Sequence, residues 1–346
     1  MDKALSSRKI CVLGGGSWGA TVATHLSRNG AQVSLWEFVD SQVKMMREKR
    51  TLSFLPQLKI PEAMLITSDM KEALEGAEII FSVVPSEFVR STWQKAKKFA
   101  GSLTLVASLS KGIEAGTLKR MTEVIAEEVP ESKDKITVVS GPSHAEEVAR
   151  DIPTAVVAAS RKKAMAELAQ KLLASHTFRV YTSPDVIGAE ICGALKNIFA
   201  IACGACDGLG LGDNTKAALI TRGLHEMAKV GVALGANQVT FFGLAGMGDL
   251  IVTCTSKHSR NRLFGEKIGM GKKAGEALKE MTMVAEGYPN SKSAYQLLQK
   301  TGCDCPLITE IYRVLYEEKN IRESLRDLLS RPLPNYGESR DLTWNA

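Results

Sequence analysis

The sequence has few of the features that mark a nucleic-acid-binding protein. Its formal net charge is only +6 over 346 residues, and aromatic residues make up 6%. No stretch interleaves aromatic side chains with a dense run of Lys and Arg, the pattern typical of nucleic-acid binding. We therefore expect no nucleic-acid partner and favour a small anionic ligand, which a mild positive charge suits.

The sequence also lacks a disulfide framework and a metal motif. Its seven cysteines are scattered and odd in number, which is typical of reduced thiols in the cytoplasm. Cys203 and Cys206 could form a split zinc site with Cys303 and Cys305, but nearly a hundred residues separate the two pairs. The first pair also lies in an apolar run, so we interpret these residues as small core residues and expect no metal.

Long apolar runs are missing as well. No segment reaches the roughly 20 apolar residues of a membrane span. The apolar run near the N-terminus ends at Leu13, glycines follow at once, and no cleavage-site pattern appears. This run is typical of a first strand and not of a signal peptide, so we expect a cytoplasmic protein without a membrane segment.

Two domains are predicted from the length and from a change of pattern near residue 184. Strand and helix patterns alternate up to that point, and only long helical patterns follow it. We therefore predict an α/β protein. Residues 1–186 form a Rossmann-like doubly wound domain that binds a dinucleotide, and residues 187–346 form an all-helical domain that holds the substrate. No Pro- or Gly-rich linker separates the two, which favours a rigid junction.

A glycine-rich turn marks the start of the first domain. The apolar run Lys9–Leu13 predicts a buried strand, and a helical pattern and a second strand at Gln32–Trp36 follow. Between strand and helix stand Gly14, Gly16 and Gly19 in the order G-x-G-x-x-G, which is the dinucleotide fingerprint. Such glycines let the backbone approach a pyrophosphate at the N-terminus of the helix.

An acidic residue after the second strand bears on the choice of cofactor. Glu37 stands 18 residues after Gly19, where a carboxylate accepts hydrogen bonds from the adenosine ribose and repels a 2′-phosphate. This position favours NAD over NADP, and Phe38 could pack on the adenine. A solvated charge at a strand end is an almost equally good interpretation of Glu37, so NADP stays open.

Further strands are predicted at 78–83, 103–107, 152–159 and 178–182. Polar loops that follow such strands carry Lys111 and Ser143. Ligands of an open parallel sheet bind outside the carboxyl ends of its strands. We therefore predict that Lys111 and Ser143 face one crevice.

The stretch from Gly193 to Met227 carries a lysine, Lys196, inside an otherwise apolar helix, and Asn197 follows it. Burial lowers the pKa of an amine from about 10.4 toward the range in which it can exchange protons near neutrality. Lys196 is therefore the predicted general base. We also expect the glycine-rich break after this helix to return the chain, at Asn214, toward the substrate.

A polar segment later in the helical half suits a phosphate. Ser259, Arg260 and Asn261 offer a hydroxyl, a guanidinium fork and an amide in succession, and small residues that precede Asp249 allow close approach of the backbone. Taken alone, however, the segment Arg260–Arg262 is better interpreted as an exposed polar helix start.

Together these segments resemble the NAD(P)-dependent glycerol-3-phosphate dehydrogenases along nearly the whole chain. The resemblance is carried by GGGSWG (14–19), VVPSEF (83–88), SLSKGIE (108–114), VSGPSHAEEV (139–148), GALKNIFAIACGACDGLGLGDNTKAALITRGL (193–224), GLAGMGDLIVTCTSKHSRNRLFG (243–265) and VAEGY (284–288). It implies reversible hydride transfer between sn-glycerol 3-phosphate and NAD(P)+, which gives dihydroxyacetone phosphate. It also implies a homodimer and a supply of glycerol 3-phosphate for glycerophospholipid synthesis.

The resemblance further implies a role for each matching residue. Lys196 exchanges the proton of the C2 hydroxyl, and Lys111 and Asp249 hold or polarise the reacting centre. The implied substrate and phosphate site consists of Lys111, Gly141, Ser143, Lys196, Asn197, Asp249, Thr253, Ser259, Arg260 and Asn261. The implied cofactor site consists of Gly14, Gly16, Ser17, Trp18, Gly19, Glu37, Phe38, Phe88, Lys111, Ala145, Arg260, Val284 and Glu286.

Two other functions are compatible with a Rossmann domain joined to helices. A β-hydroxyacid or 6-phosphogluconate-type dehydrogenase also carries a catalytic Lys-Asn pair, but the segment after Lys196 and the Ser259–Asn261 segment argue against it. A catalytically silent nicotinamide sensor would not need the polar set of the helical half. Members of the resembled family that prefer NADP tend to have a basic residue where this chain has Glu37, which again favours NAD.

Overall fold

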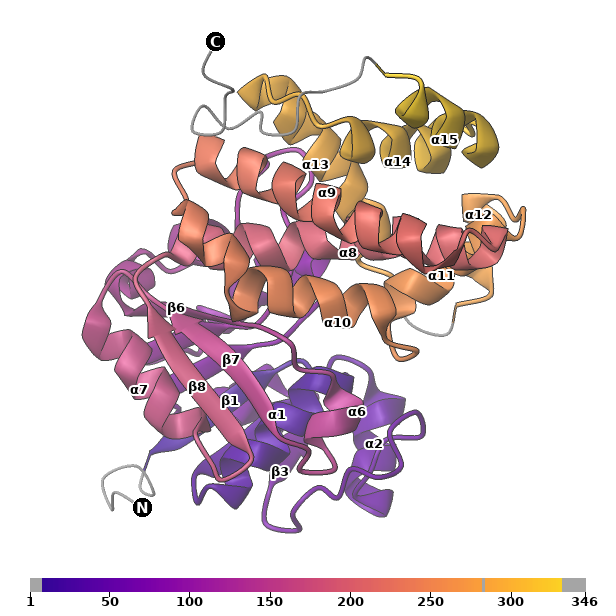
Figure 1. Ribbon diagram of the computed structural model, residues 1–346. Coiled ribbons are helices and arrows are strands. Elements are labelled where there is room, and N and C mark those ends of the chain that lie inside the picture. The colour runs from indigo at the N-terminus through magenta and orange to yellow at the C-terminus, as the bar shows by residue number, and fades with distance from the viewer. Residues whose placement is uncertain (1–7, 282–283, 332–346) are drawn as a thin grey trace.

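The structure is a computed structural model that describes residues 8–281 and 284–331. An eight-stranded sheet forms its N-terminal half, and a cluster of helices forms its C-terminal half (Figure 1). The strand order is β3-β2-β1-β4-β5-β6-β7-β8. The strands are β1 (Lys9–Leu13), β2 (Gln32–Trp36), β3 (Leu65–Thr67), β4 (Ile79–Ser82), β5 (Leu105–Ser108), β6 (Ile136–Ser140), β7 (Thr154–Ala159) and β8 (Phe178–Ser183).

The sheet is parallel except at one junction. β1 to β6 pair in parallel, and β7 and β8 pair in parallel with each other, but β7 runs antiparallel to β6 and sets Ser140 opposite Val157. The sheet is thus mainly parallel, as predicted for a Rossmann-like doubly wound domain, and the direction of β7 relative to β6 was not predicted. Periodicity does not encode this direction, because a strand buried on both faces has the same apolar pattern in either orientation.

Helices cover both faces of the sheet, as predicted for a doubly wound fold. Alternate side chains of β1 divide between the two apolar layers, with Ile10 and Val12 on one face and Cys11 and Leu13 on the other. The first face is covered by α1 (Ser17–Arg28), α2 (Asp40–Lys49) and α7 (Lys163–Leu173), and the second by α3 (Met70–Leu74), α4 (Val89–Ala96) and α5 (Met121–Glu128). The short α6 (Ala145–Val148) follows β6.

The helical half is built around α8 (Val186–Leu209), which packs against several other helices and against β6. By length and composition α8 is the one described helix apolar enough to cross a membrane, so the prediction that no segment reaches that length was wrong. The helix is nevertheless a core element, because 89% of its most apolar window is buried. The other helices are α9 (Gly212–Ala233), α10 (Asp249–Thr255), α11 (Arg260–Gly269), α12 (Ala274–Lys279), α13 (Gly287–Thr301), α14 (Pro306–Tyr316) and α15 (Ile321–Leu329).

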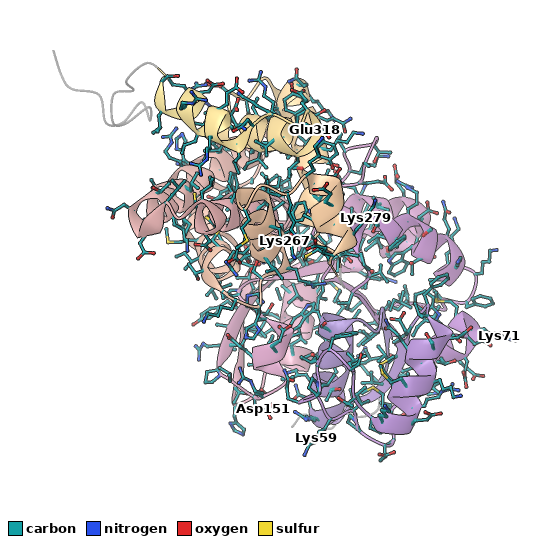
Figure 2. All side chains as sticks on the ribbon, turned by 90° about the vertical axis from the view of Figure 1, so that its right-hand side faces the viewer. Lys59, Lys71, Asp151, Lys267, Lys279 and Glu318 are labelled. Atoms are coloured by element: carbon teal, nitrogen blue, oxygen red, sulfur yellow. The ribbon has the colours of Figure 1, made fainter. Side chains whose placement is uncertain are left out.

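The change from sheet to helices occurs between the end of β8 at Ser183 and the start of α8 at Val186. The division into domains at residues 186 and 187 stays a prediction. Charged side chains of both signs lie on the outside of both halves (Figure 2), as the mild net charge leads one to expect; those labelled include Lys59, Lys71, Asp151, Lys279 and Glu318.

Candidate active site

A cavity of about 610 Å³ lies where the carboxyl ends of the parallel strands meet the helical half. The loops after β1, β2, β4, β5 and β6 form one wall, and α8, α10 and the start of α11 form the other. This is the crevice in which ligands of an open α/β sheet bind. The cavity is long enough to bring the glycine-rich turn and Lys196 into one space.

The glycine-rich turn after β1 forms a cradle at one end of the cavity. A Cβ atom on Gly19 would lie 1.8 Å from the carbonyl oxygen of Gly14, whereas one on Gly16 would meet nothing within 4 Å. Gly14 has a φ of +105°, which is strained for any other residue. No side chain caps the start of α1, so its N–H groups are available to an anion. These features fit the pyrophosphate of a dinucleotide.

The Glu37 carboxylate is fixed beside this cradle. One carboxylate oxygen accepts a hydrogen bond from the Gly15 N–H at 2.8 Å, and the other accepts one from the Val39 N–H at 2.9 Å. Glu37 is 8% exposed and lines the cavity. A solvated charge at a strand end, the alternative interpretation of Glu37, does not describe this carboxylate.

Aromatic side chains border the same end of the cavity. Phe38 is 67% exposed and Phe88 is 50% exposed, and both line the cavity. Exposed aromatic rings of this kind offer faces on which a flat base can stack. The ammonium of Lys95 lies 5.2 Å from the centroid of the Phe38 ring.

At the other end of the cavity, a single carboxylate holds two lysines. Asp249, at the start of α10, forms an ion pair with Lys196 through Oδ1, and its Oδ2 lies 2.7 Å from Nζ of Lys111. Lys196 also donates to Oγ1 of Thr253 at 2.9 Å. Asp249 and Lys196 are almost fully buried, Lys111 is partly buried, and all three side chains line the cavity.

This arrangement tunes the Lys196 amine. Burial lowers the pKa of Lys196 to about 8; the Asp249 charge works against that shift, and the Lys111 charge adds to it. Burial by itself would raise the pKa of Asp249, but the two ammonium groups outweigh it and hold that pKa below its ordinary value. Asp249 therefore remains a carboxylate while Lys196 can exchange a proton near neutral pH.

A chain of amides connects α8 to the start of α11. Oδ1 of Asn197 accepts a hydrogen bond from Nδ2 of Asn261 at 2.9 Å, and Oδ1 of Asn261 accepts one from the Gly287 N–H at 2.8 Å. The Ser259 hydroxyl caps α11 by accepting from the Arg262 N–H at 3.2 Å. Arg260 is exposed in the first turn. A helix N-terminus with an adjacent guanidinium is suited to a phosphate.

Glycines allow α8 and α11 to pack almost backbone to backbone. A Cβ on Gly204 would lie 1.8 Å from the carbonyl oxygen of Arg262, and one on Gly265 would lie 1.9 Å from that of Ile201. Gly208 and Gly269 make similar approaches one turn further along. These contacts fix the distance between Lys196 and the start of α11.

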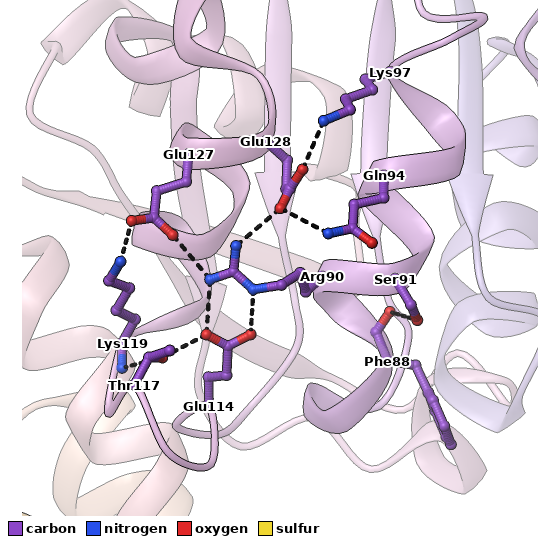
Figure 3. Close-up of polar contacts among 10 residues, drawn as sticks. All are labelled: Phe88, Arg90, Ser91, Gln94, Lys97, Glu114, Thr117, Lys119, Glu127 and Glu128. Carbon is purple, nitrogen blue, oxygen red and sulfur yellow. Dashed lines mark hydrogen bonds and ion pairs between the residues drawn. The ribbon is translucent and has the colours of Figure 1, made fainter.

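A polar network behind the Lys111 loop links it to α4 (Figure 3). The Arg90 guanidinium binds Glu114 through two hydrogen bonds of 2.7 and 2.8 Å, and it also binds Glu127 and Glu128 of α5 at 2.8 Å each. Lys97 donates to the other oxygen of Glu128 at 2.8 Å. Because Glu114 stands three residues after Lys111, Arg90 restrains the loop that carries this lysine.

Almost all residues predicted for the site line this one cavity. The exception is Gly141, whose carbonyl oxygen lies 3.4 Å from Nζ of Lys111 but which does not itself line the cavity. The expectation for Asn214 was wrong, since Asn214 is exposed and lies outside the cavity lining. α8 ends at Leu209, and Gly210 follows it in a left-handed conformation. α9 then begins at Gly212, and none of its residues lines the cavity.

The cavity contains side chains that sequence reasoning missed. His144 and His258 have ring centroids 6.2 Å apart, and burial, with a smaller effect of the Lys196 charge, lowers the pKa of His144. Lys95 lines the wall formed by α4. Ser143 and Ala145, which flank His144 in the sequence, were both predicted as site residues. Their position next to His144 was the signal from which it could have been found. Across residues 8–281 and 284–331, no group of three or more His, Cys, Asp and Glu side chains could hold a metal ion.

Two family models match the chain in succession. The model described as NAD-dependent glycerol-3-phosphate dehydrogenase N-terminus matches residues 9–166, and the corresponding C-terminus model matches residues 185–326. Together they cover most of both halves of the fold.

Individual proteins give the same result. The chain is 49% identical over 323 residues to glycerol-3-phosphate dehydrogenase [NAD(P)+] of Thermoanaerobacter sp., covering 93% of this chain and 97% of that protein. It is 46% identical over 324 residues to the protein of the same name from Geobacillus thermodenitrificans, covering 93% of this chain and 94% of the relative. A crystal structure of glycerol-3-phosphate dehydrogenase from Coxiella burnetii superposes with a TM-score of 0.89 at 38% identity, covering 94% of this chain and 100% of that one.

Proposed function

This chain belongs to the NAD-dependent glycerol-3-phosphate dehydrogenase family, and we propose that Lys196 is the group that transfers the proton in its reaction. The enzyme is an NAD(P)-dependent oxidoreductase that interconverts glycerol 3-phosphate and dihydroxyacetone phosphate. The observation that carries the proposal is the buried Lys196 amine, whose pKa is lowered to about 8 beside Asp249.

The proton step follows from this pKa. Oxidation of a secondary alcohol removes the hydroxyl proton while a hydride leaves the same carbon. When bound, the nicotinamide supplies the hydride acceptor. The neutral Lys196 amine takes the proton from the C2 hydroxyl, and in the reverse direction the Lys196 ammonium returns it. Asp249 and Thr253 orient the amine through the contacts described above.

Lys111 supplies positive charge at the same centre. Its ammonium shares Asp249 with Lys196 and lines the cavity. A cation in this position stabilises the negative charge that develops on the C2 oxygen. It also lowers the pKa of Lys196, so that Lys111 acts both on the substrate and on the base.

The phosphate of the substrate binds at the start of α11. Arg260 supplies a fork of donors, the first turn of α11 supplies N–H groups, and the Asn197–Asn261 pair lies beside them. Ser143, Gly141 and Ser259 complete this end of the site. The close packing of α8 on α11 supports the assignment, because it sets the phosphate at a fixed distance from Lys196.

The cofactor occupies the glycine-rich end of the cavity. The turn from Gly14 to Gly19 would hold its pyrophosphate, and Glu37 would accept hydrogen bonds from its adenosine ribose. Phe38 and Phe88 border the adenine, while Trp18, Ala145, Val284 and Glu286 line the path toward Lys196. The fixed Glu37 carboxylate favours NAD.

Two proposals concern the cellular setting. The enzyme acts as a homodimer in the cytoplasm, and its product supplies glycerophospholipid synthesis. The resemblance of the sequence to the family supports these proposals, and the seven free cysteines agree with a reducing compartment.

The test of the proposed function replaces Lys196 with Met. We expect dihydroxyacetone phosphate reduction by NADH to fall by about 10²–10⁴-fold, the usual contribution of a general acid or base. NADH binding, followed by fluorescence, and the thermal midpoint should stay close to those of the wild type. Lys279→Met, an exposed lysine of α12, is the matched control and should retain full turnover. A Lys196→Met enzyme with more than a tenth of the wild-type rate would contradict the assignment.

A further inference from the structure

The adenosine end of the cavity has one cation close to the second strand. The Lys and Arg residues that line the cavity are Lys95, Lys111, Lys196 and Arg260. Lys111 and Lys196 are both bound to Asp249, and Arg260 lies on the helical side. Among residues of the described chain that line the cavity, Lys95 is thus the one basic side chain in contact with the residues that follow β2.

Lys95 reaches this end of the cavity from α4. Its ammonium lies over the Phe38 ring, 5.2 Å from the centroid, and Phe38 directly follows Glu37 in the chain. Ser91 and Thr92, one turn earlier on α4, also line the cavity, as does Gln42 on α2, and none of these three is charged. No hydrogen bond or ion pair of the Lys95 side chain accompanies the contact with Phe38 in the described structure, so the ammonium can leave the ring at little cost.

The opposing charge cannot move in the same way. Both carboxylate oxygens of Glu37 accept hydrogen bonds from backbone N–H groups, Gly15 on one side and Val39 on the other. Rotating the side chain away from the ribose would break both bonds and leave the buried Gly15 N–H without its partner. A cofactor with a 2′-phosphate therefore meets a fixed negative charge, and its binding depends on a nearby cation.

We propose that Lys95 determines how well this enzyme accepts NADP(H) beside NAD(H). With NADP(H), the Lys95 ammonium turns from the Phe38 ring to the 2′-phosphate and offsets the repulsion by Glu37. With NAD(H), the two ribose hydroxyls hydrogen-bond to Glu37 and the Lys95 ammonium is not used. Cofactor choice in this chain is then a balance between a fixed carboxylate just after β2 and a mobile ammonium on α4.

The test compares both cofactors in Lys95→Met, a variant that keeps most of the length of the side chain and removes its charge. We expect kcat/KM for NADPH to fall roughly tenfold, as for the loss of a hydrogen bond to a charged group, and kcat/KM for NADH to change less than twofold. Lys98→Met is the matched control, because Lys98 is exposed, follows α4 and does not line the cavity. It removes the same charge and should leave the ratio of the two values unchanged.

Fluorescence titrations with NADPH and NADH separate this proposal from the assignment of Lys196. The Lys95→Met enzyme should bind NADPH more weakly than the wild type, and the difference should shrink at high ionic strength. Lys196→Met should bind both cofactors normally, whatever its turnover. Equal losses with both cofactors, an unchanged NADPH-to-NADH ratio, or a wild-type enzyme that does not bind NADPH would each overturn the role of Lys95.

Discussion

The pH dependence of glycerol 3-phosphate oxidation gives a direct measure of the Lys196 amine. If Lys196 is the base, as proposed, oxidation needs this amine in its neutral form; burial lowers its pKa from 10.5 to about 8. At pH 7 about one enzyme molecule in ten then carries the neutral amine, compared with about three in ten thousand for an ordinary lysine, a gain of about 300-fold. We expect the rate of oxidation to rise about tenfold per pH unit up to pH 7.5 and to level off above pH 8.5. Reduction needs the ammonium and should decline over the same range.

Removing Lys111 tests the origin of this pKa. Lys111 and Lys196 bind opposite oxygens of Asp249, and the Lys111 charge lowers the pKa of Lys196. Two like unit charges held a few ångströms apart repel each other by roughly 3–4 kcal/mol at an effective dielectric constant of 20. In Lys111→Met this repulsion is lost and Asp249 interacts with Lys196 alone. The pKa of Lys196 should rise, and the midpoint of the oxidation profile should move upward by about 1–2 pH units.

The assay records initial rates of NADH formation with saturating glycerol 3-phosphate from pH 6 to pH 10. The height of the profile will also fall, because Lys111 lines the reaction centre, so the midpoint is the quantity to compare. Lys279→Met again serves as the control and should keep the wild-type midpoint. A midpoint that stays in place or moves downward in Lys111→Met would refute the electrostatic reasoning, as would a flat wild-type profile between pH 7 and pH 9.

Two further predictions concern carboxylates away from the reaction centre. Glu114→Gln should weaken the Arg90 contact shown in Figure 3 and release the Lys111 loop, which raises the KM of dihydroxyacetone phosphate several-fold. Glu127→Gln also removes a contact with Arg90 but lies outside that loop, so it is the control and should leave this KM unchanged. Equal kinetics in both variants would contradict the role of the loop. Glu226 caps α14 through the N–H groups of Leu307 and Ile308, and burial raises its pKa from 4.5 to about 7. Between pH 4.5 and pH 7 the Glu226 carboxyl is therefore protonated in the folded state and ionised in the unfolded state, so the free energy of unfolding should fall by about 3 kcal/mol as pH rises over this range. Denaturant titrations should show this decline for the wild type and not for Glu226→Gln. Parallel declines in both proteins would contradict this role of Glu226.

The sequence predicted those parts of the fold that depend on local patterns. β1, β2 and α1 follow from a short apolar run, a glycine turn and a helical period, and all three occur within a residue or two of the predicted positions. β3 has three residues and α3 has five, which is too short for a period to emerge. The long helical pattern of α8 was evident, but its actual end at Leu209 depends on the left-handed cap at Gly210.

The candidate site divides in the same way. Lys111 and Ser143 could be placed in the cavity because the topology of an open sheet brings strand ends together, whatever the length of chain between them. Lys95 could not, because its contact with Phe38 depends on the side-chain conformation at the end of α4 and on a separation of 57 residues. The expectation that Asn214 turns toward the substrate was wrong for a related reason, since a glycine break predicts a change of direction but not which direction.

The spacing between the proposed base, Lys196, and the proposed phosphate site at the start of α11 is set by how α8 and α11 pack. Lys196 is on α8 and Asn261 is on α11, and no side chain between the helices could be compressed to bring them closer, because backbone already meets backbone at Gly204 and Gly265. The amide pair of Asn197 and Asn261 then fixes the register along the helices at 2.9 Å. A substrate whose phosphate and reacting carbon are separated by one more carbon would have to bend or lift its phosphate from α11. With the phosphate at its proposed site on α11, we therefore expect backbone contact between α8 and α11 to favour a three-carbon phosphate over a longer one.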